Sequence, residues 1–218
     1  MKSTDQNSKR VLSKAYILGG SPCSGKSTIA ERLEKEFRFQ YYKVDDHERE
    51  HSKRSDPELH PVMHQYATMS CDEIWMRPVK DQVEEEIEYY RERFEMITQD
   101  LAKYNADKPI ILEGAAYLPE LLEENNVNRR SVIFLVPTKE FQLHHYSKRP
   151  WIKHILKECK NPKQAFENWM MRDHLFGKKI LEQARERNYR TMIVNGKQDV
   201  DQQYEKIKKH FGLNKIAA

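Results

Sequence analysis

The stretch Gly20-Ser-Pro-Cys-Ser-Gly25-Lys26-Ser27 decides how this chain folds. It fits the phosphate-binding pattern G-x-x-x-x-G-K-[ST] at every fixed position. The apolar run Ala15-Tyr-Ile-Leu-Gly-Gly20 leads into it and is typical of a buried strand. Residues 27–37 follow with apolar side chains four positions apart, which predicts a helix. Strand, glycine loop and helix therefore stand in the order that a phosphate-binding loop requires.

The chemistry of phosphate binding explains this spacing. Gly20 and Gly25 let the backbone bend so that several N–H groups point into one concavity, toward which the next helix turns its positive end. Lys26 can reach the β- and γ-phosphates, and the Ser27 hydroxyl is the expected Mg²⁺ ligand. A glycine turn that binds nothing is the alternative, but motif and context agree on a binding loop. The predicted phosphate-binding residues are Gly20, Cys23, Ser24, Gly25, Lys26, Ser27 and Thr28.

Length and composition narrow the class of protein. The chain has 218 residues, which is typical of one domain, here 15–218 after a polar segment over 1–14. A mean hydropathy of −0.91 excludes a membrane protein. Met1 to Arg10 lacks the apolar stretch of a secretory signal, so a cytoplasmic location is expected. The net charge of +4 is small beside 72 charged residues, and it permits nucleic-acid binding without indicating it.

The three cysteines are Cys23, Cys71 and Cys159, an odd number at wide spacing. This pattern predicts neither a disulfide framework nor a zinc cluster. Cys23 lies near a helix N-terminus, which can lower a thiol pKa and give it a redox role. The favoured interpretation is simpler: a small residue fills this position of the loop.

Apolar runs and helical patterns alternate along the chain. Strands are predicted over 15–20, 39–46, 109–114, 131–136 and 190–195, and helices over 27–37, 72–104, 118–124, 161–187 and 200–211. Strands joined by helices form parallel sheets, so the fold class is α/β. Within 72–104, apolar residues at spacings of three and four indicate core packing rather than a cofactor site; they are Val83, Ile87, Tyr90, Phe94, Ile97 and Leu101.

Polar residues follow several of these strands directly. The glycine loop follows the first strand, Asp45-Asp46 the second, Glu113-Gly114 the third and Asn195-Gly196 the fifth. Ligands of parallel sheets bind beyond the carboxyl ends of the strands. We therefore expect these four segments to gather at one edge of the sheet.

With these motifs the chain resembles a P-loop kinase of the nucleoside/nucleotide kinase-like group, from about residue 15 to 212. Val44-Asp-Asp-His47 is similar to the acidic box after the second strand in gluconate-kinase-like and phosphoglycerate-kinase-like members. Ile110-Ile-Leu-Glu-Gly114, followed by Tyr117-Leu-Pro119, is similar to a strand segment of the latter. The resemblance implies a P-loop NTPase fold: a five-stranded parallel sheet flanked by helices, with a helical acceptor-binding insertion over 47–108 and a lid over 145–175.

The resemblance also implies an activity and roles for matching residues. The chain would transfer the γ-phosphoryl group of ATP, with Mg²⁺, to a hydroxyl of a small molecule, or alternatively to a phosphate of one. The implied catalytic residues are Lys26, Asp45, Arg149 and Arg172, and the implied metal ligands are Ser27, Asp45 and Glu113. Asp45 would accept the proton of the acceptor hydroxyl, and the two arginines would neutralise the transferring group.

Asp46 competes with Asp45 for the role of base. Adjacent side chains on a strand point to opposite faces, so only one of the two can face the phosphates. A purely structural alternative is that both acids cap the next helix. The resemblance favours Asp45.

The identity of the acceptor is left open by the sequence. Arg49, Arg54, Arg77 and Lys80 are candidates for an anionic acceptor, and Tyr66 and Trp75 for stacking on a ring; all fit surface or core roles equally well. The sequence also leaves open whether ATP or GTP is used, and whether the chain is a monomer or a homodimer.

Three alternative functions remain. His47-Glu48-Arg49-Glu50-His51 fits the zinc-hydrolase pattern H-E-x-x-H, but this stretch is nearly all charged and not the core helix that such a site needs. A nucleotide-binding switch or an ATPase shares the glycine loop, but no strand here carries four apolar residues followed by Asp. A kinase of nucleic-acid ends is disfavoured by the modest charge.

Overall fold

A five-stranded, all-parallel sheet forms the centre of the protein, for which the computed structural model describes residues 2–215, with side chains over 6–214. The strand order is β2-β3-β1-β4-β5, so the strand that leads into the glycine loop lies in the middle. The strands are β1 Ala15–Gly20, β2 Gln40–Lys43, β3 Ile110–Glu113, β4 Val132–Pro137 and β5 Arg190–Val194. The predicted α/β class and the P-loop NTPase arrangement of sheet and helices are confirmed.

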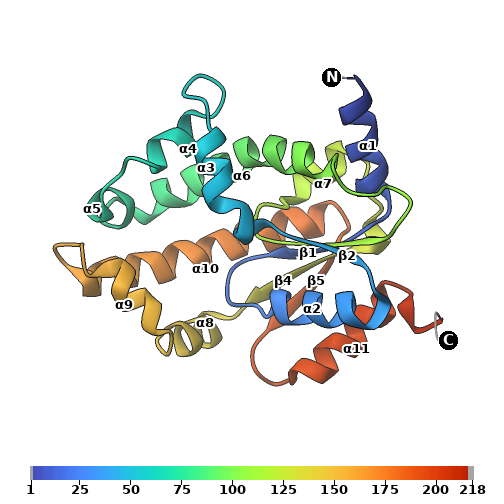
Figure 1. Ribbon diagram of the computed structural model, residues 1–218. Coiled ribbons are helices and arrows are strands. Elements are labelled where there is room, and N and C mark those ends of the chain that lie inside the picture. Colours follow the sequence, from blue (N-terminus) through green and yellow to red (C-terminus); the bar gives the residue numbers. More distant parts are fainter. Residues whose placement is uncertain (1, 216–218) are drawn as a thin grey trace.

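Helices cover both faces of the sheet (Figure 1). Helices α1, α6, α7 and α10 lie over one face, and α2 and α11 over the other. The α-helices are α1 Lys2–Ser13, α2 Lys26–Phe37, α3 Glu48–Arg54, α4 Pro61–Tyr66, α5 Cys71–Trp75, α6 Val79–Leu101, α7 Pro119–Glu124, α8 Lys139–Tyr146, α9 Pro150–Leu156, α10 Pro162–Glu186 and α11 Val200–His210. Short 3₁₀ helices are η1 Val44–His47, η2 Arg129–Ser131 and η3 Leu213–Lys215.

Alternating strand residues divide the core into two layers, as the period of a strand requires. Ile17 of β1, with Ile110 and Leu112 of β3, packs under α1, α6 and α10. Leu18 and Ile111 face the other way and pack against α2 and α11. Both faces of the sheet are covered, which is why the central strands are apolar at nearly every position. Within residues 2–215, no helix is long and apolar enough to cross a membrane.

Three segments differ from the sequence predictions. Within the segment 1–14, predicted only as polar, Lys2–Ser13 form α1, in which Val11 and Leu12 are buried in the core. The predicted helix over 72–104 is two helices, α5 and α6, that break at Pro78, because proline disfavours helical backbone at the residue before it. The predicted strand over 39–46 ends at Lys43, and the residues after it turn into η1.

A third apolar cluster lies beyond the end of the sheet and joins two distant segments of the chain. Trp75 of α5 stacks on Trp169 of α10 with ring centroids 4.3 Å apart. The Asn168 side chain donates to the Trp75 carbonyl at 2.7 Å. A disulfide between Cys71 and Cys159 links the same two segments, which the sequence did not predict. Disulfides are rare in the cytoplasm, so this bond does not favour the cytoplasmic location expected from the sequence.

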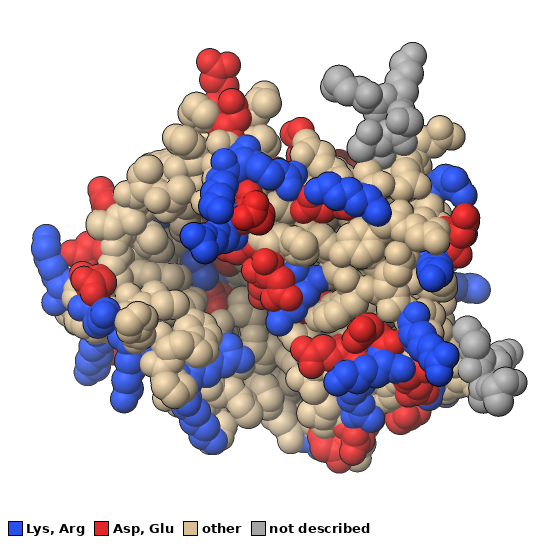
Figure 2. Space-filling view, viewed as in Figure 1, with Lys and Arg blue, Asp and Glu red and all other residues tan. Residues whose placement is uncertain are grey.

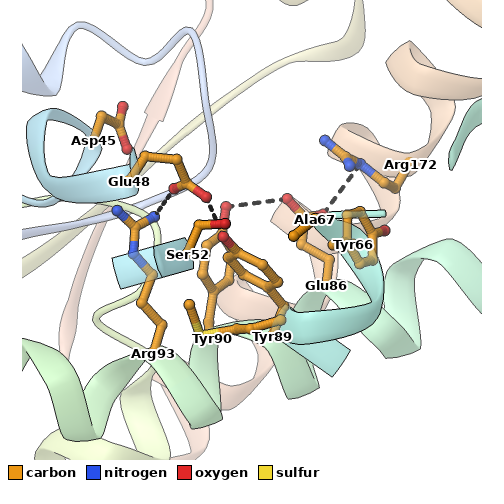
Figure 3. A pocket seen from close by; sticks show the side chains of 11 residues that line it. Asp45, Glu48, Ser52, Tyr66, Ala67, Glu86, Tyr89, Tyr90, Arg93 and Arg172 are labelled. Atoms are coloured by element: carbon orange, nitrogen blue, oxygen red, sulfur yellow. Dashed lines mark hydrogen bonds and ion pairs between the residues drawn. The ribbon is translucent and has the colours of Figure 1, made fainter. Parts of the chain in front are cut away.

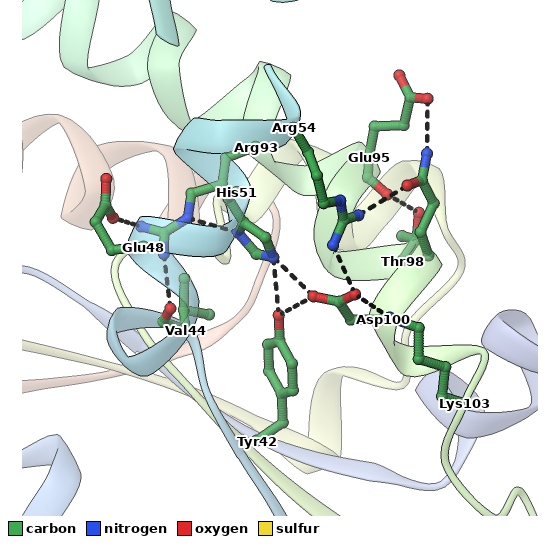
Figure 4. A network of polar contacts seen from close by, with 11 residues as sticks. Tyr42, Val44, Glu48, His51, Arg54, Arg93, Glu95, Thr98, Asp100 and Lys103 are labelled. Atoms are coloured by element: carbon green, nitrogen blue, oxygen red, sulfur yellow. Dashed lines mark hydrogen bonds and ion pairs between the residues drawn. The ribbon is translucent and has the colours of Figure 1, made fainter. Parts of the chain in front are cut away.

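A buried polar network fastens α3 to α6 (Figure 4). His51 Nδ1 accepts from Arg93 Nε at 3.0 Å, so its Nε2 carries the proton that is donated to Asp100 at 2.7 Å. Burial opposes the charge on Asp100, but hydrogen bonds from Lys103, His51 and Arg54 hold the pKa of its carboxyl well below the usual range. This network fixes the start of the segment 47–108 against the long helix behind it.

The disulfide should stabilise the fold measurably, because it closes a loop with a sequence separation of 88 residues. Constraint of the unfolded chain by such a loop is worth about 2–4 kcal/mol. We expect dithiothreitol to lower the free energy of unfolding of the wild type by this amount in urea titrations, and to leave Cys71→Ser unchanged. Cys23→Ser should respond like the wild type. An equal stability of the wild type with and without reductant would contradict this prediction.

Candidate functional site

The loop between β1 and α2 has the backbone that the sequence motif demands. Gly20 has a φ of +114°, and a Cβ there would lie 2.0 Å from the Leu135 carbonyl oxygen, so no other residue fits. Gly25 has a φ of +80° and precedes the first residue of α2. A Cβ at Gly25 would meet nothing within 4 Å, so the position that a side chain would take there is open space. Cys23 also adopts a left-handed φ of 63°. The loop therefore has the bends that form an anion nest at a helix N-terminus.

Lys26 is buried in this loop with its ammonium group held by the loop itself. Its Nζ donates to the Ser21 carbonyl at 2.7 Å and to the Ser24 hydroxyl at 3.3 Å. Burial lowers the pKa of Lys26, and the nearby Glu113 carboxylate opposes this shift. An ammonium group without a full ionic partner favours an anion beside it, because a buried charge is costly unless it is paired. The loop is therefore suited to phosphate.

Ser27 and Glu113 meet although 86 residues separate them. The Ser27 hydroxyl donates to Glu113 Oε1 at 3.2 Å, and the Tyr41 hydroxyl donates to Oε2 at 3.3 Å. Burial raises the pKa of Glu113, while Lys26 counteracts the shift. A hydroxyl and a carboxylate side by side are the oxygen ligands that Mg²⁺ takes in sites shared with phosphates. The predicted metal ligands Ser27 and Glu113 thus lie together.

The two acids after β2 separate clearly. Both lie on η1 and not on a strand, so the prediction that strand geometry points their side chains to opposite faces is wrong. The 3₁₀ turn gives the two side chains different surroundings instead. Asp46 is exposed and lies 3.7 Å from Lys43. The Asp45 side chain has no ion-pairing or hydrogen-bonding partner among the described residues, and it lines the cavity over the glycine loop. Of the two, Asp45 is the one at the site.

Arg149 and Arg172 both line the same cavity, but in different states. Arg149 has no acidic partner among residues 6–214; its guanidinium lies 4.7 Å from the Tyr146 ring centroid, with Nη2 3.7 Å from Cys23 Sγ. The Arg172 side chain is 11% exposed, and it donates from Nε and Nη2 to Asp173 at 3.1 and 2.8 Å. Burial disfavours the charge on Arg172, but Glu86 and Asp173 outweigh it and raise its pKa. Arg149 is the freer of the two cations.

Together these residues line a cavity of about 460 Å³. Figure 2 shows the surface hollowed between the α3 side and the α8–α9 side of the molecule, with acidic and basic side chains at its edge. The cavity brings together all of the predicted phosphate-binding residues except Gly20, which is the last residue of β1. It also brings in Asp45, Glu113, Arg149 and Arg172. Asn195-Gly196 does not line it, because β5 is at the far edge of the sheet.

A second cavity of about 280 Å³ adjoins the first (Figure 3). The two share Asp45, Glu86, Tyr90 and Arg172 in their linings. The spacing of apolar residues along α6 predicts core packing for Tyr90, and Tyr90 packs against the core as well as lining both cavities. Glu86 was missed, since nothing in a charged helix marks which glutamate points inward. Burial raises the pKa of Glu86 to about 7, with Arg172 opposing the shift.

Two other sequence features lead to structural roles. His51 uses both ring nitrogens in the network with Arg93 and Asp100, and the His47 ring stacks on Tyr42 at 4.3 Å. His47 lies before α3 rather than within it, so the H-E-x-x-H pattern does not present two imidazoles to a metal.

Burial raises the pKa of the Cys23 thiol, with Arg149 opposing, so this thiol is not activated by the helix N-terminus.

Several solved structures resemble this chain. Shikimate kinase of Aquifex aeolicus matches with 17% identity over 94% of this chain and 99% of that chain, at a TM-score of 0.39. Shikimate kinase of Acinetobacter baumannii, in complex with shikimate, matches with 17% identity over 93% and 94%, at 0.44. The YorR protein of Bacillus subtilis, in complex with phosphorylated GDP, matches with 14% identity over 94% and 99%, at 0.42.

These likenesses are distant, and the interpretation of the site rests on the residues of this chain. No protein-family model and no curated protein matches the sequence. The narrower resemblance to gluconate-kinase-like and phosphoglycerate-kinase-like enzymes is not confirmed.

Gly25→Ala should weaken anion binding as well as stability, whereas its control, Gly212→Ala, should lower stability alone. Both glycines have positive φ, +80° and +71°, and a Cβ at either meets nothing within 4 Å. Each substitution should therefore cost a similar 1–2 kcal/mol, roughly, of folding free energy. Only Gly25→Ala should also weaken the binding of inorganic triphosphate, by about tenfold or more, since hydrogen bonds to charged groups contribute about 1.5–3 kcal/mol each. Equal triphosphate affinity of the two variants in equilibrium dialysis would contradict the site.

The raised pKa of Glu86 predicts a pH dependence of stability. Between the ordinary pKa of 4.5 and about 7, the folded chain binds more protons at this residue than the unfolded chain. The stabilising effect of the neutral form is thus present at low pH and is lost as pH rises through this window. From about pH 5 to about pH 7.5, the free energy of unfolding of the wild type should fall by roughly 1–3 kcal/mol relative to Glu86→Gln. Glu84→Gln, exposed on the same helix, should track the wild type; if Glu86→Gln does so too, the assignment is wrong.

Proposed function

We propose that the protein is a P-loop kinase that transfers the γ-phosphoryl group of ATP to a hydroxyl of a small molecule. The observation that supports this most is the junction of the two cavities at Asp45, Glu86, Tyr90 and Arg172. A nucleotide switch or an ATPase needs only the cavity over the glycine loop. A second cavity that opens onto the same acidic and basic groups provides a place for an acceptor.

The residues of the loop bind and orient the nucleotide. Backbone N–H groups and Lys26 hold the β- and γ-phosphates, and Arg149 approaches them from the lid side. Ser27, Glu113 and, through water, Asp45 suit Mg²⁺, because they supply oxygen ligands beside the phosphate position. When bound, the metal neutralises charge on the β- and γ-phosphate oxygens.

Asp45 is the base in this proposal. Its carboxylate accepts the proton of the acceptor hydroxyl while the hydroxyl oxygen bonds to the γ-phosphorus. The bond from the γ-phosphorus to the β–γ bridging oxygen breaks, and ADP leaves with that oxygen. Arg149 neutralises charge on the transferring group. Arg172 does so through its Nη1, which is not bonded to the carboxylate partners of this side chain.

The cytoplasmic location remains a prediction, as do the lid role of 145–175 and the use of ATP rather than GTP. In the structure, α5 packs against the start of α10. The stacked Trp75 and Trp169 rings and the Cys71–Cys159 disulfide join the lid region to the acceptor region. Closure would therefore move the two regions as one body.

Asp45→Asn tests the chemical step, with Asp46→Asn as a control one residue away on the same exposed turn. Loss of a general base lowers turnover by about 10²- to 10⁴-fold. Asp45→Asn should show this loss in kcat with an unchanged affinity for ATP, and Asp46→Asn should keep the wild-type rate. Lys26→Ala should bind neither ATP nor triphosphate yet unfold cooperatively. Equal turnover of the two aspartate variants would refute the base assignment. A Lys26→Ala chain that still transfers phosphate would refute the role of Lys26, and a wild type that transfers phosphate to no acceptor would refute the kinase proposal.

A further inference from the structure

The cavity that adjoins the phosphate site has a composition that selects among acceptors. Its lining comes from η1, α3, α4, α6 and α10, and includes three carboxylates, two guanidinium groups and three tyrosine rings. Figure 3 shows Glu48 and Glu86 on opposite sides of the Tyr89 and Tyr90 rings. The charges of these groups, and the partners they already have, indicate what the cavity can accept.

Neither arginine of the cavity is available to an anionic acceptor. The Arg93 side chain is only 2% exposed, and each of its nitrogens has a partner: Nε donates to His51 at 3.0 Å, Nη2 to the Val44 carbonyl at 2.6 Å, and Nη1 pairs with Glu48. Arg172 is paired with Asp173 and lies 3.3 Å from Glu86 Oε2. The Nη1 of Arg172 has no carboxylate partner among the described residues, but it neutralises the transferring phosphoryl group in the proposed reaction. A carboxylate or phosphate on the acceptor would therefore have to displace a carboxylate of the protein from one of the two arginines.

Cations suggested by the sequence for an anionic acceptor are also engaged or lie elsewhere. Arg54 donates to Asp100 at 2.9 Å, and Arg77 pairs with Glu85. Arg49 and Lys80 are exposed and do not line the cavity. The Trp75 ring stacks on Trp169. Of the six residues proposed to contact an acceptor, only Tyr66 lines this cavity.

The carboxylates, in contrast, exceed the cations that face them. Asp45 has no partner among the described residues, and the Arg172 charge is shared between Glu86 and Asp173. Glu86 Oε2 accepts no hydrogen bond in the described part of the chain, although its side chain is only 6% exposed. Carboxylates around a cavity with surplus negative charge favour a cationic ligand, which restores the balance.

The tyrosine rings favour the same kind of ligand. The Tyr66 and Tyr89 rings meet edge to face at 5.5 Å, and the Tyr89 and Tyr90 rings at 5.9 Å. The Tyr89 hydroxyl is bonded to Glu48 and the Tyr90 hydroxyl to Glu86 Oε1, so the polar ends of both rings point at the carboxylates. Aromatic faces beside carboxylates attract ammonium groups.

Resting on the proposed kinase function, we propose that the acceptor is an alcohol that carries a protonated amine, such as an amino sugar or an amino alcohol. Its ammonium group lies between Glu48, Glu86 and the tyrosine rings, and its hydroxyl reaches Asp45 at the junction with the phosphate cavity. Because burial raises the pKa of Glu86 to about 7, a bound ammonium would also keep this carboxyl ionised at neutral pH.

Acceptors of similar size and different charge test this proposal. Glucosamine, glucose and gluconate form one such set, and ethanolamine, ethylene glycol and glycolate another. In each set we expect the amine to give the highest kcat/KM in ATP-dependent phosphorylation, and to raise the Tm of the ATP-bound protein more than its neutral or acidic counterpart. An acid that is phosphorylated best would overturn the proposal, and so would a panel in which no amine is phosphorylated or raises the Tm.

A variant pair makes the test specific to the cavity. Glu48→Gln removes one carboxylate and frees Arg93 Nη1, whereas Glu50→Gln alters an exposed glutamate of the same helix that pairs with Lys53. Glu48→Gln should raise KM for the amine about tenfold, the worth of one charge-assisted hydrogen bond, and should improve the acidic counterpart. Glu50→Gln should match the wild type, and equal selectivity of both variants would contradict the proposal. Phosphoryl transfer to the neutral and acidic acceptors, measured in the same samples, separates the two kinds of failure: transfer to these acceptors but not to amines contradicts this inference alone, whereas ATP binding without transfer to any acceptor contradicts the kinase function.

Discussion

The structure depends on one constraint: the backbone after β1 must bend back around the buried ammonium group of Lys26. Gly20 makes this bend where any Cβ would collide with the Leu135 carbonyl, and Gly25 makes the second bend at the start of α2. A buried ammonium group is costly without an anion. The carbonyl of Ser21 and the hydroxyl of Ser24 offset part of that cost, and phosphate oxygens would offset more.

Sheet topology places the remaining groups around this loop. The order β2-β3-β1 puts the residues after three neighbouring strands side by side, so Asp45 and Glu113 reach the loop from segments far apart in the sequence. Helices α6 and α10 then supply Glu86 and Arg172 from the opposite wall, where the two cavities meet. The site is thus built from rigid strand ends on one side and packed helices on the other, which favours a fixed geometry over the reacting atoms.

The sequence predicted the parts that depend on local pattern. The glycine loop, the five strands and the position of Glu113 follow from a motif, from apolar runs and from the ends of those runs. The choice between Asp45 and Asp46 depended on a 3₁₀ turn that no periodicity reveals. The inward position of Glu86 and the pairing of Cys71 with Cys159 arise only when distant helices pack, because a charged helix face and a widely spaced cysteine look alike whether buried or exposed. Pro78 marked the break between α5 and α6, and its effect on the preceding residue was a readable signal.

Isothermal titration calorimetry of the intact chain with ATP and Mg²⁺ tests the central claim most directly, because it reports whether the loop holds a polyphosphate, whatever the acceptor. The account predicts heat from a single site per chain in the wild type, and none in a folded Lys26→Ala chain, since the buried ammonium group completes the phosphate cradle. A folded wild type that releases no heat, or a Lys26→Ala chain that binds as the wild type does, would contradict it.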